Sequence, residues 1–282
     1  MRFYQLDNDT KKYIKRLNYN GITTPSDIYS VDQFIRGLKD LGVYGNMIEG
    51  WFLRKNHNAG SGNIVYAFRD NFSNGTINNV STAVWNDRGL VCTANAAGNL
   101  SNYINGNLRS NSLPTVSMFS VFMSTVAGME NFTSGYPYVF SLSRNQYNSG
   151  SGGSSLSNTT FGSNGTNWGA SFGNNNNAGS IQGNTLFKMV KGSLTSSTVL
   201  VESRNSSSTL TSASTANTIG LLRYDRFIFG GRWNNTIESS NGSFGVGFHG
   251  THIFHCFFDI NVNFVSFESL FKSTIGKGIA LP

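Results

Sequence analysis

The residue composition of this chain changes near residue 53, and this change limits the folds that the chain can adopt. Before it, apolar residues recur at spacings of three and four between charged residues and glycines, which is typical of amphipathic helices. From about Phe72 to Asp259, Asn, Ser, Gly and Thr predominate and separate short apolar and aromatic runs. Such runs, bounded by turn-forming residues, are typical of β-strands. The sequence therefore predicts a small helical segment followed by a long all-β body.

The overall composition indicates a folded β-protein with an uncharged polar surface. The chain has 282 residues, of which 38% are hydrophobic and 13% aromatic, enough for a packed core. Only 12% are charged, which is about half of the usual share. Asn, Ser, Thr and Gly must therefore make most of the surface polar, as is typical of extracellular or virion β-proteins rather than of cytosolic enzymes.

The net charge of +7 is thinly spread along the chain. Its densest cluster is formed by Lys11, Lys12, Lys15 and Arg16. Without a longer basic run or interleaved aromatic residues, we interpret this cluster as a solvated helix face rather than a nucleic-acid site. The first ten residues lack the apolar segment of a secretory signal, and no apolar run is long enough to span a bilayer. We therefore expect no nucleic-acid partner and no membrane insertion.

The two cysteines, Cys92 and Cys256, lie beside apolar residues in strand-like stretches. Two buried free thiols are expected, with a disulfide between them as the alternative. Triplets of the type Asn-x-Ser/Thr, such as Asn71-Phe72-Ser73, are interpreted as a consequence of the composition, because no secretory signal precedes them. The chain is thus expected to be made in a reducing cytoplasm.

Two helices are predicted in the first part of the chain. The apolar side of the first helix carries Leu6, Tyr13, Ile14 and Leu17. This helix ends at Asn20-Gly21, because glycine readily adopts the left-handed conformation. In the second helix, Thr24 is the predicted N-cap and Pro25 the first helical residue, and the apolar stripe ends at Gly42.

An aromatic lead-in follows the two helices. It contains Tyr44, Met47, Ile48, Trp51, Phe52 and Leu53. We expect these residues to bury the hairpin against the body, because a pair of helices cannot bury its own apolar stripe alone. The predicted organisation is a helical hairpin with its lead-in over residues 1–53 and a β-sandwich over residues 54–282.

The body reads as many short strands. They are predicted at Ile64–Phe68, Gly89–Ala94, Val116–Thr125, Tyr138–Leu142, Phe187–Lys191, Ser197–Arg204, Arg226–Phe229, Phe244–His249 and Thr251–Asp259. Ser117–Phe122 has apolar residues on both faces, which predicts a central strand. The segment 147–184 is poor in apolar residues and is interpreted as weak strands with long loops. Together these strands predict a mainly-β fold, a two-sheet antiparallel sandwich of jelly-roll type. After Asp259, an apolar pattern predicts a final helix that packs beside the hairpin.

No arrangement of residues typical of catalysis stands out. Glycosidases need two facing carboxylates. From residue 131 onward the acids are widely separated, namely Glu202, Asp225, Glu238, Asp259 and Glu268. Neither a Gly-x-Ser-x-Gly elbow nor a nucleotide-binding fingerprint is present. We therefore expect no catalytic residues, no cofactor and no enzymatic activity, although distant acids can converge in a fold.

One string of histidines invites a metal-site hypothesis, His249-Gly-Thr-His252-Ile-Phe-His255. On a regular strand His249 and His255 share a face while His252 points away, unless Gly250 marks a bulge. Histidines of a strand near a loop are therefore favoured over a metal site. Three loop aromatics could stack on sugars or instead cover the bases of their loops: Tyr136, Tyr147 and Trp168.

The stretch Asp9–Phe52 resembles the N-terminal segment of phage structural proteins with a concanavalin-like lectin domain. The resemblance lies in Asn20-Gly21-Ile22-Thr23 after the first helix, the core Leu38-Lys39-Asp40-Leu41-Gly42 of the second, and the trailing Met47. Tyr44 stands where that family has a tryptophan. Towards the C-terminus, the strand Phe227-Ile228-Phe229-Gly230-Gly231 is similarly followed by another strand and a final helix. The middle of the chain matches in composition only.

The resemblance implies a concanavalin-like jelly-roll sandwich and a virion component of the head, neck or tail, without a known cofactor. Our first hypothesis is a non-enzymatic structural protein of a phage particle, assembled in the host cytoplasm. It would act through contacts with other virion proteins and with symmetric copies of itself. The helix pair would supply part of that interface, or would only seal one end of the sandwich. A module that binds host-surface glycans is the second hypothesis, and a glycosidase is the third.

Overall fold

The computed structural model describes residues 5–19, 27–78, 83–92, 103–124, 138–143, 159–163, 167–172, 176–182, 187–204, 209–217, 221–230, 248 and 250–279. Its helices are α1 (Asn8–Tyr19), α2 (Ile28–Asp40) and α3 (Phe264–Ser273). Short 3-10 turns are η1 (Tyr44–Asn46), η2 (Lys55–His57) and η3 (Asn71–Ser73). Within these described ranges, no helix is long and apolar enough to cross a bilayer.

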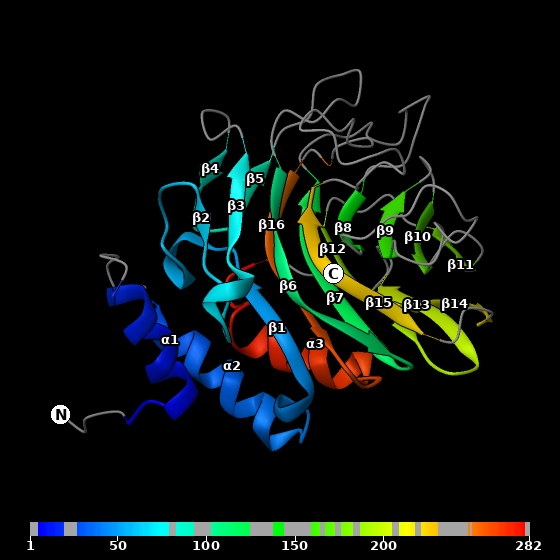
Figure 1. The fold of residues 1–282 in the computed structure, drawn as a ribbon, viewed down its shortest axis with the longest axis horizontal. Coiled ribbons are helices and arrows are strands. Elements are labelled where there is room, and N and C mark those ends of the chain that lie inside the picture. Colours follow the sequence, from blue (N-terminus) through cyan, green and yellow to red (C-terminus); the bar gives the residue numbers. More distant parts are fainter. Residues whose placement is uncertain are drawn as a thin grey trace.

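The strands form two antiparallel sheets that face each other (Figure 1). Sheet A runs in the order β14 (Leu210–Ala216), β13 (Thr198–Arg204), β12 (Phe187–Leu194), β7 (Val116–Ser124), β16 (Gly250–Phe258), β5 (Leu90–Cys92) and β4 (Val84–Trp85), with β1 (Met47–Phe52) also on β16. Sheet B runs in the order β11 (Asn176–Gln182), β10 (Asn167–Phe172), β9 (Thr159–Ser163), β8 (Tyr138–Ser143), β15 (Leu222–Phe229), β6 (Tyr103–Leu113), β3 (Gly75–Asn78) and β2 (Ile64–Val65).

Strand β16 connects the N-terminal and C-terminal parts of sheet A. One of its edges pairs with β7 along the whole strand. The other edge is shared, since β5 pairs with Gly250–His252 and β1 pairs with Phe254–Phe258. The aromatic segment predicted as a lead-in is therefore itself a strand of the sandwich.

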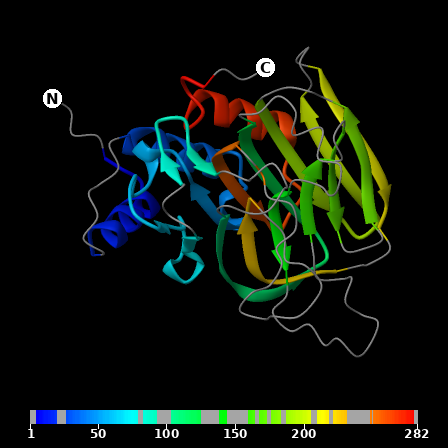
Figure 2. The same cartoon turned by 90° about the horizontal axis from the view of Figure 1, so that it is seen from above.

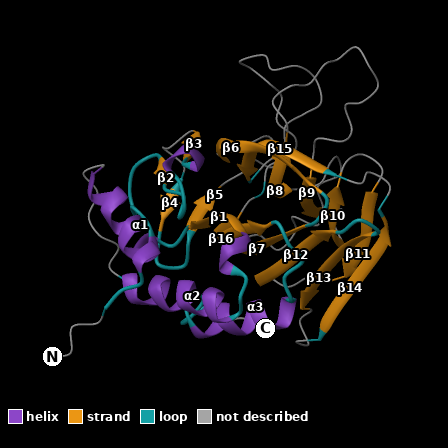
Figure 3. Ribbon diagram, turned by 60° about the horizontal axis from the view of Figure 1, so that its bottom comes forward, coloured by secondary structure: helices purple, strands orange, loops and turns teal. Residues whose placement is uncertain are grey.

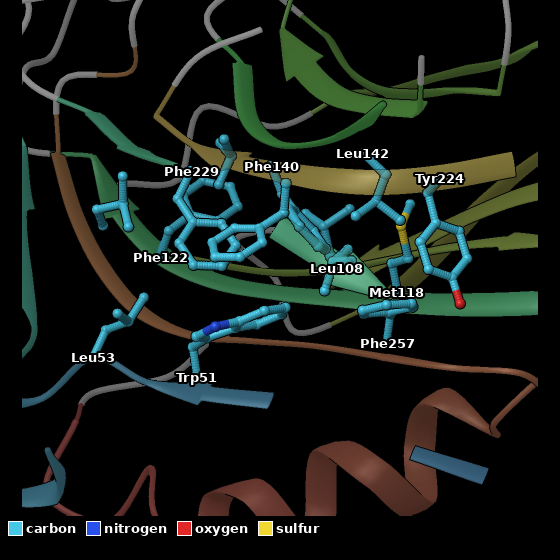
Figure 4. Packing of buried hydrophobic residues seen from close by; sticks show 14 of the residues in the cluster. Trp51, Leu53, Leu108, Met118, Phe122, Phe140, Leu142, Tyr224, Phe229 and Phe257 are labelled. Carbon is cyan, nitrogen blue, oxygen red and sulfur yellow. The ribbon is translucent and has the colours of Figure 1, made fainter. Parts of the chain in front are cut away.

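Trp51 lies at the centre of the core between the two sheets. Its ring centroid is 4.5 Å from that of Phe227 and 5.1 Å from that of Phe229, both on sheet B. On the side of sheet A it stacks at 6.3 Å on Phe257. Figure 4 shows Trp51, Phe229 and Phe257 among the apolar side chains that fill this space. Because large aromatic rings bury the most apolar area per residue, this cluster contributes much of the packing energy of the sandwich.

A second core lies between the outer face of sheet A and the helices. Phe267 of α3 stacks on Phe119 of β7 at 3.8 Å and meets Phe34 of α2 edge to face at 5.8 Å. Phe34 in turn meets Phe254 of β16 at 5.2 Å. Helices α2 and α3 lie side by side over this face (Figures 1 and 3), and the view from above places α3 next to the N-terminal helices (Figure 2). The predicted packing of the last helix beside the hairpin is confirmed.

The predicted fold class is confirmed: a concanavalin-like antiparallel sandwich with N-terminal and C-terminal helices. Strand β7 is central, between β12 and β16, as its two apolar faces predicted. Cys92 and Cys256 are buried free thiols, as expected. Cys92 belongs to the core between the sheets and Cys256 to the core under the helices, so sheet A separates them.

Some sequence predictions are corrected by the structure. The N-cap of α2 is Asp27 rather than Thr24, because an Asp27 carboxylate oxygen accepts the backbone N–H of Ser30 at 3.2 Å. Strands β6 and β14 were missed, because small polar residues, mainly Asn and Ser in β6 and Ser and Thr in β14, outnumber their apolar residues. Thr24 itself and the predicted strand Phe244–His249 lie outside the described residues, apart from Phe248.

Candidate functional site

The carboxylates of the C-terminal half are engaged in structural contacts. Lys191 Nζ lies 2.6 Å from Glu202 Oε2. Arg204 Nε donates to both carboxylate oxygens of Glu268 at 2.6 Å, and Lys272 Nζ lies 3.0 Å from one of them. Three other acids were named from the sequence. Asp259 accepts a hydrogen bond from Asn46 Nδ2 at 2.8 Å, and Asp225 lies on β15. Glu238 lies outside the described residues. Glu202 and Glu268 are thus each held by cations.

The histidine string lies inside the sandwich. His252 Nδ1 is 2.9 Å from His255 Nε2, and His255 Nδ1 is 3.1 Å from Ser120 Oγ. The expectation that His252 points away from His255 is wrong. A register shift between His252 and Phe254 places an extra residue, Ile253, in β16, and this bulge turns both imidazoles to the same side. The bulge is not at Gly250, and His249 lies outside the described residues.

The two imidazoles are enclosed by aromatic rings and are fully buried. His255 packs at 4.3 Å against Phe229 and at 5.5 Å against Phe140, and His252 at 5.1 Å against Phe248. Burial lowers the pKa of His252 to about 3, and burial together with the charge of its neighbour lowers the pKa of His255 well below its ordinary value. Among the residues that the structure describes, no three His, Cys, Asp or Glu side chains are grouped to hold a metal. The pair is therefore neutral at physiological pH and out of reach of a substrate.

The sequence-predicted loop aromatics do not add to a described site. Tyr136 and Tyr147 lie outside the described residues. Trp168 lies on β10, in sheet B, where the backbone is described but the side chain is not.

On the outer face of sheet B, strands β3 and β6 carry a row of polar side chains. Ile77 and Ile104 point into the core, so their strand neighbours Thr76, Asn78 and Asn105 point outward. Asn78 Nδ2 donates to Asn105 Oδ1 at 2.7 Å, which fixes the two amides relative to each other. This face contrasts with the outer face of sheet A, which the helices cover.

At the end of this row lies a group that we call the shelf, formed by Asp70, Phe72 and Arg109. Asp70 Oδ1 accepts the backbone N–H of Phe72 at 2.9 Å and caps η3. Its other oxygen accepts Nε and Nη2 of Arg109, at 2.9 and 2.6 Å. One carboxylate therefore holds both the backbone of the turn that carries the aromatic ring and a guanidinium, whose carbon lies 6.0 Å from the ring centroid. Phe72 is nevertheless 52% exposed and the Arg109 side chain 80% exposed.

The electrostatics of the shelf favour the ionised carboxylate. Partial burial raises the pKa of Asp70, but the N–H of Phe72 and the Arg109 guanidinium outweigh it, so the pKa lies below its usual value. Arg109 uses only one side of its guanidinium for Asp70, because the described hydrogen bonds involve Nε and Nη2. Arginine has five donors in all, so N–H groups remain that can face a ligand.

The backbone under the shelf is held from several sides. Trp51 Nε1 donates to the Ser73 carbonyl at 2.9 Å, which anchors η3 to the core. The buried carboxylate of Glu49 accepts the backbone N–H of Arg69 at 2.7 Å and that of Asp70 at 3.1 Å. Arg16 of α1 donates to the carbonyls of Ala67, Phe68 and Arg69. A site held in this way presents its groups with little loss of freedom on binding.

Sequence reasoning missed the shelf. Asn71-Phe72-Ser73 attracted notice only as a triplet of the glycosylation type. A phenylalanine between turn-forming residues, two positions after an aspartate, is a weak signal of an exposed ring on a capped turn. Arg109 is 39 residues away from Asp70, so only the pairing of β3 with β6 brings it to the ring.

No protein-family model matches this chain. No curated protein sequence matches it either. Among solved structures it is similar to a mutant of the Trypanosoma rangeli sialidase displaying trans-sialidase activity, with 9% identity and a TM-score of 0.49 over 89% of this chain and 40% of that one. It is also similar to the binding domain of botulinum neurotoxin serotype D, with 10% identity and a TM-score of 0.47 over 83% and 52% of the two chains. The Ca²⁺-bound exoplasmic/lumenal domain of VIP36 is similar as well, with 8% identity and a TM-score of 0.41 over 71% of this chain and 88% of that one. The chain spans less than half of the sialidase, and the likeness concerns overall architecture alone.

Proposed function

We propose that this chain is a non-catalytic binding module whose ligand is a carbohydrate, bound at the shelf and along the adjoining amide row. The observation that carries the proposal is the exposed pair of Phe72 and Arg109, fixed by the Asp70 carboxylate. Sugars present a C–H face that stacks on an aromatic ring and hydroxyls that pair with planar polar groups. The shelf offers both kinds of group in one place.

The amide row extends the same chemistry along β3 and β6. Thr76 is exposed, and Asn78 and Asn105 are partly exposed beside it. Side chains that are already fixed lose little conformational entropy when a ligand binds, so a few such groups suffice for useful affinity. The proposal is non-catalytic because Glu202 and Glu268 are held by cations and the imidazoles are enclosed in the core.

The test is a glycan array followed by calorimetry on the glycans that bind. In the variant Phe72→Ala we expect affinity to fall by about 5- to 150-fold, since stacking of one ring contributes on the order of 1–3 kcal/mol. Arg109→Ala should weaken binding similarly. Ile64→Ala, another exposed apolar residue but on β2, is the matched control and should bind like the wild type. Equal affinity of the Phe72 variant and the wild type, or binding to no glycan, would sink the proposal.

We also propose a second candidate, the structural role in a phage particle that the N-terminal resemblance implies. It is favoured by the exposed apolar residues Leu41, after α2, and Val265, in the first turn of α3. The chain segments that follow α2 and precede α3 are joined to each other, because Asn46 and Asp259 form hydrogen bonds of 2.8 and 3.0 Å. The partners would be other virion proteins and further copies of this chain.

Sedimentation of purified protein tests this second role through self-association. The double variant Leu41→Gln, Val265→Gln should shift a homo-oligomer towards monomer, whereas the control Ile64→Gln should not. A wild type that is monomeric at micromolar concentration, or a double variant with an unchanged oligomeric state, would argue against the helical layer as an interface.

A further inference from the structure

A chain of polar groups crosses an otherwise apolar part of the core. It runs from His252 to His255 and on to Ser120, with separations of 2.9 and 3.1 Å. We infer that this buried chain is an acid-sensitive lock, which holds β16 in sheet A at neutral pH and releases it in mildly acidic solution. The lock is independent of the proposed ligand site.

Strand β16 is the element that such a lock would control. It pairs with β7 on one edge and with β1 and β5 on the other, and Phe254 on its opposite face packs against α2. The bulge at Ile253 places both imidazoles on the inward side of the strand, where they contact each other. Loss of the His252–His255 bond would therefore disturb sheet A and both cores together.

The described surroundings of the pair offer nothing to balance a positive charge. The titratable groups that face the interior from the neighbouring strands are the Cys92 thiol on β5 and the Tyr224 hydroxyl on β15, and burial raises the pKa of both. On β7, Ser120 lies within hydrogen-bond distance of His255, and on β8 the ring of Phe140 packs against it. On β1, Trp51 is the residue paired with His255 across the two strands.

One cationic side chain faces the same interior. Lys188 on β12 is opposite Phe122 of β7, which is itself opposite His252, so the three residues form a row across sheet A. Lys188 is buried, and burial lowers the pKa of its amine to about 8. At acidic pH it is therefore charged and would repel an imidazolium.

The contact between His252 Nδ1 and His255 Nε2 has room for one proton between the two nitrogens. At 2.9 Å one ring must donate and the other accept. Protonating both rings would turn this bond into a contact between two donors with like charges. The unfolded chain has no such limit and binds two protons below its ordinary histidine pKa of about 6.5. Acid therefore favours the open state.

Two other buried groups with shifted pKa values also contribute to the pH dependence of stability and must be separated from the lock. His57 lies 3.4 Å from Asp27, and burial lowers its pKa. Glu49 changes the stability in the opposite direction, because burial raises its pKa to about 7 and acid then favours the folded state. Both groups stay in place in a variant that removes only the lock, so a comparison with the wild type isolates its contribution.

The experiment is urea unfolding at pH values from 7.5 to 4.5, followed by tryptophan fluorescence. Each proton taken up on unfolding makes the unfolding equilibrium constant rise about tenfold per pH unit. The triple variant His252→Leu, His255→Leu, Ser120→Ala removes the whole chain of polar groups with apolar replacements. Below about pH 6.5, its unfolding equilibrium constant should rise up to about a hundredfold less per pH unit than that of the wild type, because two buried imidazoles are removed. His57→Gln is the matched control: it removes one buried imidazole outside the lock, so its equilibrium constant should rise at most about tenfold less per pH unit than that of the wild type.

Ring resonances of the wild type provide a second readout that needs no variant. In the folded protein, we expect the His252 and His255 rings to stay neutral down to the pH at which β16 opens. The inference is overturned if both rings titrate near pH 6.5 while the protein remains folded. It is equally overturned if the triple variant folds and is as steep as the wild type. If the triple variant does not fold, the ring titration decides.

Discussion

At the scale of single residues, Asp70 explains how an exposed surface becomes ordered. Its two carboxylate oxygens hold the turn that carries Phe72 and the guanidinium of Arg109. Exposed ion pairs contribute little to stability by themselves, typically below about 1 kcal/mol. The contact therefore serves to orient the ring and the guanidinium rather than to stabilise the fold.

A buried hydrogen bond supports this surface from below, and it can be removed on its own. Trp51→Phe keeps a ring in the core but deletes the donor to the Ser73 carbonyl. We expect the free energy of unfolding to fall by about 2–3 kcal/mol, from the lost bond and the smaller ring. Urea unfolding measures this, and glycan affinity should fall with it because η3 loses its anchor.

Trp85→Phe is the control for that change. Trp85 also donates from its indole, to the Gly62 carbonyl at 3.2 Å, but it is only partly buried. Its replacement should cost less than about 1 kcal/mol. If both variants lose the same stability, the anchoring role of Trp51 is wrong.

At the scale of elements, the approach of the β4–β5 turn to β16 depends on one glycine. A Cβ atom at Gly89 would lie 2.2 Å from the His252 carbonyl oxygen, which is backbone and cannot rotate away. We expect Gly89→Ala to destabilise the fold by about 2–3 kcal/mol, measured by thermal or urea unfolding. Gly45→Ala, where nothing lies within 4 Å of the new atom, should be close to neutral.

Phe267 is one of the buried rings that hold helix α3 on sheet A, beside Phe264 and Phe271. Phe267 is fully buried and stacks on Phe119 at 3.8 Å. Phe267→Ala should cost about 3–5 kcal/mol, as for other buried aromatic residues. Val265 on the same helix is 48% exposed. The substitution Val265→Ala should therefore change the free energy of unfolding by less than about 0.5 kcal/mol. Hydrogen exchange of the α3 amides should rise strongly in the first variant and little in the second.

Elements with a clear apolar pattern could be predicted from the sequence, and elements rich in small polar residues could not. The apolar stripes of α2 and α3 and the two-faced pattern of β7 were sufficient to place them. Strand β6 could not be predicted, because Asn105, Asn107 and Asn111 interrupt it and, among its described side chains, Ile104 and Leu108 are the buried hydrophobic ones. The bulge at Ile253 also leaves no signal in the sequence, since it follows from how two imidazoles share the interior.

At the scale of the whole molecule, one sheet separates two apolar cores. Sheet A has the sandwich interior on one face and the helical layer on the other, whereas strands β3 and β6 of sheet B present Thr76, Asn78 and Asn105 outward. The change of composition near residue 53 thus marks the entry of the chain into sheet A through β1. The shelf could not be predicted, because its groups meet only once β3 and β6 are paired.

The stability of the whole molecule should depend on pH through the histidine pair. The folded pKa of His252, about 3, lies below the ordinary value of 6.5, so the unfolded state binds more protons between these values. The contribution of the pair to stability is therefore complete above about pH 6.5 and is lost as the pH falls towards 3, by up to about 1.4 kcal/mol per pH unit for each proton, and Glu49 offsets part of this loss because its folded pKa is raised. Chemical unfolding at a series of pH values should show this loss, and stability that is constant down to pH 4 would contradict it.

The most direct test of carbohydrate binding at the shelf is a structure of the protein with a glycan selected on the array. The account predicts a sugar ring against Phe72, with hydroxyl groups within hydrogen-bond distance of Arg109 and of the amides of Asn78 and Asn105. A glycan bound elsewhere on the molecule, with Phe72 and Arg109 still open to solvent, would contradict it.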